Sequence, residues 1–219
     1  DGRRIVEVDD WALELQQFVS GEGMKVTAGT LSQAALALGR FHEVCRDFAR
    51  PPRDARMWRF SEVPFDTFAK LYQKAKDENP GDRVDEQCNA IALFLQDAGR
   101  ALSWEARNEF ETGLIHGDWH AGNLIFADNK LAAILDLEFA GDGCYLEDLA
   151  YAVSNLCIRT SADPARLRER TDLLLSRYRQ SRTLSFSEEV ALYYAVGVKH
   201  ITTVSYQLLQ NEGKVAGYT

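Results

Sequence analysis

Hydrophobic and polar residues follow two different periods along this chain. They alternate over residues 3–8 and again over residues 11–19, with Asp9 and Asp10 between the two runs. Alternation is typical of half-buried strands, so the start of the chain predicts a β-hairpin. After a break at residues 20–23, most apolar residues recur at helical spacing instead. The pattern therefore predicts a short strand-forming region followed by a mainly helical body.

The first helix of this body has clear start and stop signals. Thr30 and Gln33 form a capping-box pattern, and apolar residues continue at helical spacing to about Arg50, before Pro51 and Pro52 end the helix. The Gly-Asp-Gly sequence of residues 141–143 predicts a loose turn. Further helices are expected over residues 65–76, 84–95, 103–111, 146–158, 165–178 and 187–209.

A different pattern occupies residues 114–138, LIHGDWHAGNLIFADNKLAAILDLE. An apolar pair precedes a polar loop, and two short apolar runs then flank a polar turn at residues 128–130. These runs predict a second β-hairpin. Because a hairpin returns the chain to the edge where it began, it carries Asp136 back beside the loop that contains Asp118 and Asn123.

Two carboxylates and one carboxamide are thus expected to converge. Oxygen ligands of this kind suit Mg²⁺. Phosphoryl transfer needs one carboxylate that accepts the proton of the acceptor hydroxyl, together with oxygen ligands that hold a metal against the triphosphate. Asp118, Asn123 and Asp136 have the chemistry for these roles.

The spacing of this loop resembles that of known kinases. Asp-x-x-x-x-Asn, from Asp118 to Asn123, matches the catalytic loop of protein kinases, and a loop beginning His-Gly-Asp is similar to that of the aminoglycoside phosphotransferase and choline kinase-like family. The resemblance implies that Asp118 is the catalytic base, and that Asn123 and Asp136 are metal ligands.

The match extends to three further residues, His116, Glu138 and Asp148. By resemblance, Asp148 supports the catalytic loop and does not touch the substrate, and acidic residues in the first turn of a helix also complement its dipole. His116 is given a supporting role. Glu138 is interpreted either as a supporting residue or as a substrate contact.

The resemblance also implies a fold and a division of the chain. It implies an α+β, protein kinase-like fold whose mostly helical C-terminal lobe carries a catalytic β-hairpin. Residues 1–19 would then be the terminal strands of an N-terminal lobe and its hinge, and residues 20–219 the C-terminal lobe. Gln17, Phe18 and Val19 would be the hinge whose backbone binds the adenine of ATP.

The family's phosphate-covering loop and strand lysine are not found ahead of this hinge, because Lys25 follows it. We therefore expect this chain to be a C-terminal portion, with the missing N-terminal lobe either upstream or on a separate chain. The chain alone is then expected to show little phosphotransfer.

The expected function is ATP- and Mg²⁺-dependent transfer of the γ-phosphoryl group to a hydroxyl of a small molecule. An aminoglycoside, choline, homoserine or a similar metabolite is compatible with the sequence as this acceptor. The alternative is a pseudokinase or nucleotide-binding regulatory module without turnover, although a binding module has no need to retain Asp118. A protein kinase is disfavoured because no long activation loop with an Ala-Pro-Glu anchor follows Asp136.

Two other interpretations of residues 114–138 are open. His116, Asp118 and His120 would share one face of a strand, as in a metal hydrolase, but the surrounding glycines favour a loop. The other histidines, His42 and His200, lie in helical patterns typical of packing residues. The segment can also be a plain hairpin with a polar turn. No role is assigned to His120.

Composition narrows the class of protein. A chain of 219 residues with 46% hydrophobic content can bury a sizeable core, and no apolar run approaches the roughly 20 residues of a membrane span. We expect a cytoplasmic protein without a membrane partner. A net charge of -8 disfavours nucleic-acid binding. The four cysteines form no C-x-x-C pair and predict free thiols.

Overall fold

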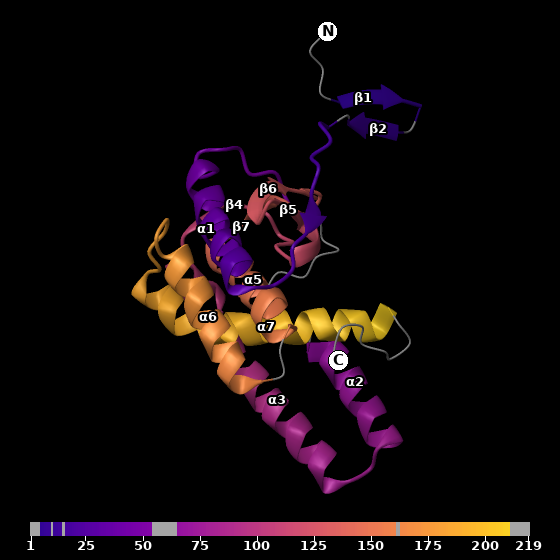
Figure 1. Ribbon diagram of the computed structural model, residues 1–219. Coiled ribbons are helices and arrows are strands. Elements are labelled where there is room, and N and C mark those ends of the chain that lie inside the picture. Colours follow the sequence, from indigo (N-terminus) through magenta and orange to yellow (C-terminus); the bar gives the residue numbers. More distant parts are fainter. Residues whose placement is uncertain (1–4, 10, 15, 54–64, 161–162, 211–219) are drawn as a thin grey trace.

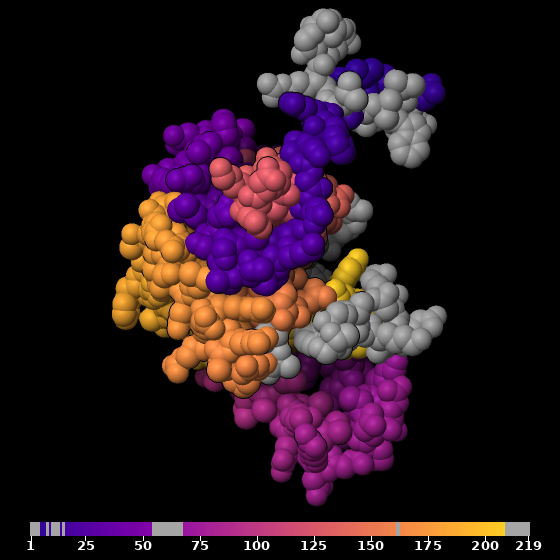
Figure 2. All heavy atoms as spheres, in the orientation of Figure 1, coloured from indigo at the N-terminus to yellow at the C-terminus, as the bar shows by residue number. Residues whose placement is uncertain are grey.

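The computed structural model describes residues 5–9, 11–14, 16–53, 65–160 and 163–210 (Figure 1). Helices dominate it, and strands are a minority, as the sequence predicts. The space-filling view shows a packed body from which two parts project at opposite ends, the N-terminal hairpin and the pair formed by helices α2 and α3 (Figure 2).

The predicted N-terminal hairpin is present but shorter than expected. Strand β1 (Ile5–Val8) pairs in an antiparallel manner with β2 (Trp11–Glu14), and Asp9 in the turn has a left-handed backbone with φ of 52°. The prediction that the second strand reaches residue 19 is wrong. Among the described residues, Glu14 is the last of the second run to pair, and its partner is Ile5. Residues 3, 4, 10 and 15 of the predicted hairpin lie outside the described residues. Residues 16–20 have no regular secondary structure.

The first helix begins earlier and ends earlier than its sequence pattern predicts. Helix α1 covers Ala28–Val44, and its N-cap is Thr27. The capping box joins Thr27 to Thr30, since each side chain accepts a hydrogen bond from the other residue's backbone N–H. Gln33 is therefore free of any capping role. Its side-chain amide instead donates to the backbone carbonyl of Asn129, 96 residues away, at the turn of the hairpin predicted within residues 114–138.

The remaining helices lie where the periodicity places them, with two exceptions. The segment expected at residues 103–111 is helical only in α4 (Trp104–Arg107), because strand β4 begins at Thr112. The segment expected at residues 146–158 is α5 (Tyr145–Val153) followed by a π-helical turn, η2 (Ser154–Ile158). The other helices are α2 (Phe65–Glu78), α3 (Asp82–Ala101), α6 (Pro164–Tyr178) and α7 (Phe186–Gln210).

Two small sheets flank the loop of interest. Strand β4 (Thr112–Ile115) pairs with β7 (Gly141–Cys144), so the loose turn predicted at residues 141–143 is wrong. Glycine allows β7 to approach β4 closely, because a Cβ on Gly143 would lie 2.4 Å from Cδ1 of Ile115. In the other sheet, β5 (Leu124–Ala127) lies between β3 (Glu22–Gly23) and β6 (Lys130–Ile134).

The hydrophobic core lies where α1, α5, α6 and α7 meet. Leu38 of α1, Leu149 of α5 and Leu174 of α6 are fully buried there. Trp119, from the loop between β4 and β5, is fully buried in the same core. A large aromatic side chain thus fixes this loop to the helical body, where its polar neighbours find their partners.

Candidate active site

The loop that follows β4 is held by one carboxylate. Asp148, in the first turn of α5, accepts hydrogen bonds from the backbone N–H of His116 at 2.7 Å and of Gly117 at 2.8 Å. Burial opposes ionisation of Asp148, yet the hydrogen bonds from His42 and from the backbone N–H of His116 lower its pKa below the ordinary value. An ionised Asp148 therefore makes strong bonds to the start of the loop.

Gly117 and His116 shape the loop from within. Gly117 has φ of +83°, and a Cβ there would lie 2.4 Å from the carbonyl oxygen of Phe139, so only glycine fits. The His116 Nδ1 accepts from the backbone N–H of Asp118 at 3.2 Å, and its Nε2 therefore donates to the carbonyl of Leu135 at 3.0 Å. The buried His116 ring thus ties the loop to the end of the catalytic hairpin.

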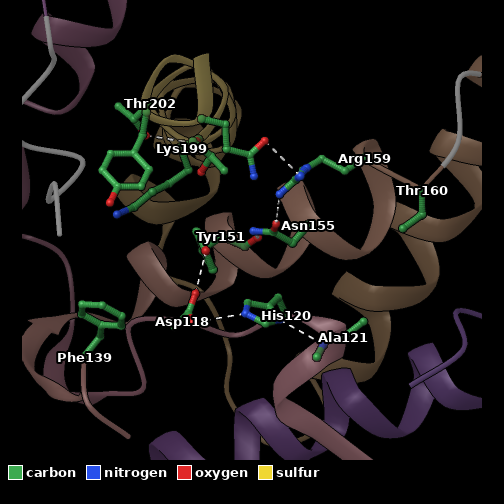
Figure 3. A pocket seen from close by; sticks show the side chains of 14 residues that line it. Asp118, His120, Ala121, Phe139, Tyr151, Asn155, Arg159, Thr160, Lys199 and Thr202 are labelled. Carbon is green, nitrogen blue, oxygen red and sulfur yellow. Dashed lines mark hydrogen bonds and ion pairs between the residues drawn. The ribbon is translucent and has the colours of Figure 1, made fainter. Parts of the chain in front are cut away.

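Three side chains surround the Asp118 carboxylate, and two of them, Tyr151 and His120, are drawn in Figure 3. The Tyr151 hydroxyl donates to Oδ1 at 2.7 Å, while Asn123 Nδ2 and His120 Nε2 lie 3.0 Å and 3.2 Å from Oδ2. His120 Nδ1 accepts from the backbone N–H of Gly122, so its Nε2 carries the hydrogen that faces Asp118. Burial raises the pKa of Asp118, but these three partners outweigh it and lower the pKa. Asp118 is therefore an oriented, ionised carboxylate.

The hairpin of β5 and β6 brings the remaining predicted residues to this loop. Asn123 Nδ2 donates to both the backbone and side-chain oxygens of Asp118, which leaves its Oδ1 as an acceptor. The N–H of Leu135 donates to the carbonyl of Asn123 at 2.8 Å, and Asp136 is the next residue. Asp136 is exposed with φ of 62°, and no hydrogen bond or ion pair engages its carboxylate within the described residues.

A cavity of about 620 Å³ opens in front of Asp118 (Figure 3). The loop forms its floor, and the α5–η2 helix and α7 form its walls. Asp118 is the only carboxylate among the described residues that line the cavity. Arg159 and Lys199 belong to the same lining, and the buried Lys199 ammonium bonds to the carboxylate of Glu147 at 3.0 Å. The Arg159 guanidinium donates to Oδ1 of Asn155 at 3.0 Å and to Oε1 of Gln207 at 3.2 Å.

Comparison with known families identifies the chain. A model of the phosphotransferase enzyme family matches residues 1–183. The chain belongs to this family. Homoserine kinase from Rhodospirillum rubrum is 29% identical over 161 residues, which are 74% of this chain and 46% of that protein. Homoserine kinase from Mesorhizobium japonicum is 26% identical over 166 residues, 76% of this chain and 48% of that protein. This phosphotransferase chain thus spans about half the length of the curated relatives it matches.

Solved structures share the fold. An aminoglycoside phosphotransferase from Alicyclobacillus acidocaldarius matches with a TM-score of 0.70 and 16% identity, covering 97% of this chain and 66% of that one. A choline kinase from Cryptosporidium parvum matches with a TM-score of 0.56 and 14% identity, covering 95% of this chain and 68% of that one. The predicted α+β, protein kinase-like fold is confirmed.

Several side chains that line this cavity are absent from the sequence-based assignment: Tyr151, Asn155, Arg159 and Lys199. Two signals point to them. Asp148, Tyr151 and Asn155 follow one another at intervals of three and four residues, which places them on one helical face. Lys199 is a charged residue in an otherwise apolar stretch of α7.

The other predicted residues lie apart from the cavity. Glu138 is exposed and is absent from the described lining residues. Gln17, Phe18 and Val19 are exposed in the segment between β2 and β3, and their role as a hinge stays a prediction.

The arrangement disfavours the metal-hydrolase alternative. His116 lies in a loop, and both its ring nitrogens are engaged with the backbone. Across the part of the chain that the structure describes, no group of three or more His, Cys, Asp or Glu residues is arranged to hold a metal. The four cysteines are free, as expected, although Cys88 and Cys144 are only half-buried. None of the described helices is both long and apolar enough to cross a membrane.

Proposed function

We propose that this chain carries the catalytic residues of a phosphotransferase that moves the γ-phosphoryl group of ATP to a hydroxyl of a small molecule. The observation that carries the proposal is the Asp118 carboxylate, held by three donors at the floor of a cavity and joined through Asn123 to the hairpin that ends at Asp136. Membership of the phosphotransferase family and the kinases among its relatives support the same reaction class.

Asp118 acts as the base in this proposal. Its carboxylate accepts the proton of the acceptor hydroxyl as the hydroxyl oxygen bonds to the γ-phosphorus and the bond from phosphorus to the ADP oxygen breaks. Tyr151 and His120 hold the carboxylate toward the cavity, so that little reorientation is needed at the moment of transfer.

Asn123 and Asp136 are proposed to hold Mg²⁺. The donor set fits, because the hydrogen bonds of Asn123 leave its Oδ1 as an acceptor, and the exposed Asp136 carboxylate has no partner among the described residues. The left-handed backbone of Asp136 is the kind of local strain that functional sites retain. When bound, Mg²⁺ neutralises charge that develops on the transferring phosphates.

We propose an acceptor that carries a carboxylate as well as its hydroxyl, with homoserine as the leading candidate. Arg159 stands in the cavity wall, and Asp118 is the only carboxylate among the described lining residues, whereas the charge of Lys199 is paired with the buried Glu147. Such walls favour an anionic group and disfavour a polycation such as an aminoglycoside. The named activity of the curated relatives supports the same choice.

The hinge and the division into lobes complete the proposal. Gln17, Phe18 and Val19 would supply backbone contacts to adenine, which is supported by their exposure and by the absence of regular secondary structure at residues 16–20. Residues 1–19 would belong to the N-terminal lobe, and residues 20–219 to the C-terminal lobe. A cytoplasmic location likewise stays a prediction.

The test is ADP release from Mg-ATP by a protein that carries these residues together with the missing N-terminal lobe, with homoserine, choline and an aminoglycoside as acceptors. Asp118→Asn is expected to lower kcat by about 10²- to 10⁴-fold, because it removes the base, while nucleotide affinity stays within a few-fold. Asp128→Asn is the matched control, since Asp128 is exposed at the turn of the same hairpin. Nucleotide binding without turnover on any acceptor would instead indicate a regulatory module.

A further inference from the structure

A chain of buried side chains connects the start of α7 to the catalytic loop. Arg182, in the connection between α6 and α7, donates from Nη1 to the Tyr178 hydroxyl at 3.3 Å. That hydroxyl lies 2.9 Å from Nδ1 of His42, and Nε2 of His42 lies 3.1 Å from Oδ2 of Asp148. Asp148 in turn accepts from the backbone N–H groups of the loop at His116 and Gly117.

The end of this chain at Arg182 is firmly anchored. Arg182 Nη2 donates to Oε1 of Glu188 at 2.5 Å, and its Nε donates to Oε2 of Glu111 at 2.8 Å. Glu188 and Tyr178 are fully buried. Because a guanidinium only donates, the Tyr178 oxygen must accept from Arg182.

The donors and acceptors then allow one arrangement of hydrogens. The Asp148 carboxylate accepts only, so Nε2 of His42 must carry a hydrogen and donate to it. The Tyr178 oxygen accepts from Arg182, and its own hydrogen has one remaining partner among the described residues, Nδ1 of His42. Donation therefore runs in one direction, from Arg182 through Tyr178 and His42 to Asp148.

The other forms of His42 leave a hydrogen bond unmade. An imidazolium would donate from Nδ1 as well, and the Tyr178 hydrogen would then have no acceptor within the described residues. A neutral ring with its hydrogen on Nδ1 would turn the Nε2 lone pair toward the Asp148 carboxylate. The first alternative leaves the Tyr178 hydrogen without an acceptor among the described residues, and the second places two acceptors face to face, in a site that is fully buried.

We infer that Tyr178 and Arg182 are positioning residues that keep His42 neutral with its hydrogen on Nε2, and so hold Asp148 against the catalytic loop. The catalytic part of this inference rests on the proposed function, whereas the state of His42 does not. Neither Tyr178 nor Arg182 lines the cavity, so they act through His42 and Asp148.

The charges around His42 agree with a neutral ring that donates to Asp148. Burial lowers the pKa of His42, Arg182 lowers it further, and Asp148 on α5 and Glu111 before β4 act in the opposite direction without reversing the shift. Tyr145 of α5 stacks on the His42 ring at 4.4 Å, and its hydroxyl donates to the backbone carbonyl of His42. Tyr145 therefore packs beside the ring without contacting either ring nitrogen through its hydroxyl.

Nuclear magnetic resonance of the labelled full chain between pH 5 and 8 tests the inference without any activity assay. In the unmodified protein, the ring nitrogens of His42 are expected to report a neutral Nε2–H form throughout. Tyr178→Phe removes the donor to Nδ1, so the His42 pKa is expected to rise by about one unit. The amide protons of His116 and Gly117 are expected to follow that titration.

Tyr145→Phe is the matched control, because it removes a neighbouring hydroxyl that contacts only the backbone of His42. Its His42 titration is expected to match that of the unmodified protein. Equal behaviour of the two variants would overturn the inference, as would a charged His42 or a hydrogen on Nδ1 in the unmodified protein. If Tyr178→Phe fails to fold, the unmodified spectrum still decides the state of His42, and Arg182→Lys serves as the second variant. Failure of phosphotransfer would leave these results unchanged.

Discussion

Three buried charges meet behind the wall of the cavity. Glu147 accepts a hydrogen bond from Lys199 Nζ at 3.0 Å and forms a second ion pair with Arg53, and all three side chains are almost completely buried. Burial alone raises the pKa of Glu147, but the positive charges of Lys199 and Arg53 outweigh it and lower the pKa. One carboxylate thus neutralises two cations and joins α5, α7 and the segment after α1.

Glu147→Gln is expected to destabilise the protein by about 3–5 kcal/mol, because it leaves two buried cations without a counter-charge. Urea denaturation at pH 7 measures the change. Glu43→Gln is the control, since Glu43 pairs with Arg46 at the surface, and its effect is expected to stay within about 1 kcal/mol.

The difference in unfolding free energy between the unmodified protein and Glu147→Gln depends on pH, because the pKa of Glu147 is lowered in the folded state. Its stabilisation is fully present above the unfolded-state pKa of about 4.3, and it is lost as the pH falls through the folded-state pKa. The gap between the unmodified protein and Glu147→Gln should therefore narrow below about pH 4. An equal loss of unfolding free energy in Glu147→Gln and Glu43→Gln would contradict this account.

At the residue scale, the sequence predicts those site residues whose spacing is local. Asp118 and Asn123 lie on one loop, and a hairpin fixes the return of Asp136. Tyr151 and Lys199 could not be assigned to the site from local spacing. They belong to α5 and α7, and which face of each helix points to the site depends on tertiary packing. Of the residues predicted from the loop and the hairpin, Asp118 is the only one among the described lining residues of the cavity, and its walls come from the helices.

At the scale of elements, the contact between α1 and α6 depends on one glycine. A Cβ on Gly39 would lie 2.9 Å from Cβ of Ser181 and 3.0 Å from the carbonyl oxygen of Tyr178. The helix backbone therefore approaches the end of α6 more closely than any side chain permits. This contact also helps to place Tyr178 within reach of His42.

Gly39→Ala is expected to destabilise the protein by about 1–3 kcal/mol through overpacking, although alanine is the better helix former. Gly29→Ala in the same helix is the control. Its nearest neighbour would be 3.9 Å away, so it is expected to stabilise by about 0.4–1 kcal/mol. Urea denaturation of both variants decides the matter, and a stabilising Gly39→Ala would show that α1 and α6 adjust without strain.

Element boundaries were less predictable than element types. Thr30 and Gln33 match the capping-box pattern, but the N-cap is Thr27, which pairs with Thr30 three residues later. The Gln33 side chain instead forms hydrogen bonds with the backbone of Asn129 and Leu131 at the hairpin turn. Strand β7 has a sequence typical of a turn. Its extended form depends on pairing with β4, which is a contact between distant residues that no local pattern contains.

At the scale of the whole molecule, α2 and α3 project as a pair from the body of the protein, and few of their described side chains are buried (Figure 1). Among the described residues of α3, only Leu95 and Ala98 are buried, and both lie in its C-terminal half, where the helix contacts α7. Segments with few buried apolar contacts open at low free energy.

Hydrogen exchange measured by mass spectrometry is expected to show this difference. Amides of α2 and of the first half of α3 should exchange faster than those of α1 and α5, whose residues fill the core. Helix α6 is the comparison, since it also exposes many of its residues but packs on α1 and buries Leu174 and Tyr178. Protection of α2 equal to that of α5 would contradict the expected order.

The hydrogen bond between His42 and Tyr178 joins residues 136 positions apart. Chains emerge from the ribosome at about 5–20 residues per second, so roughly 7–27 s separate the synthesis of these two residues. Throughout that interval, α1 lacks the helix against which its buried face packs. The hydrogen bond from Tyr178 to His42 therefore cannot form in a nascent molecule until α6 has been made, and the face of α1 that packs on α6 stays uncovered by it until then.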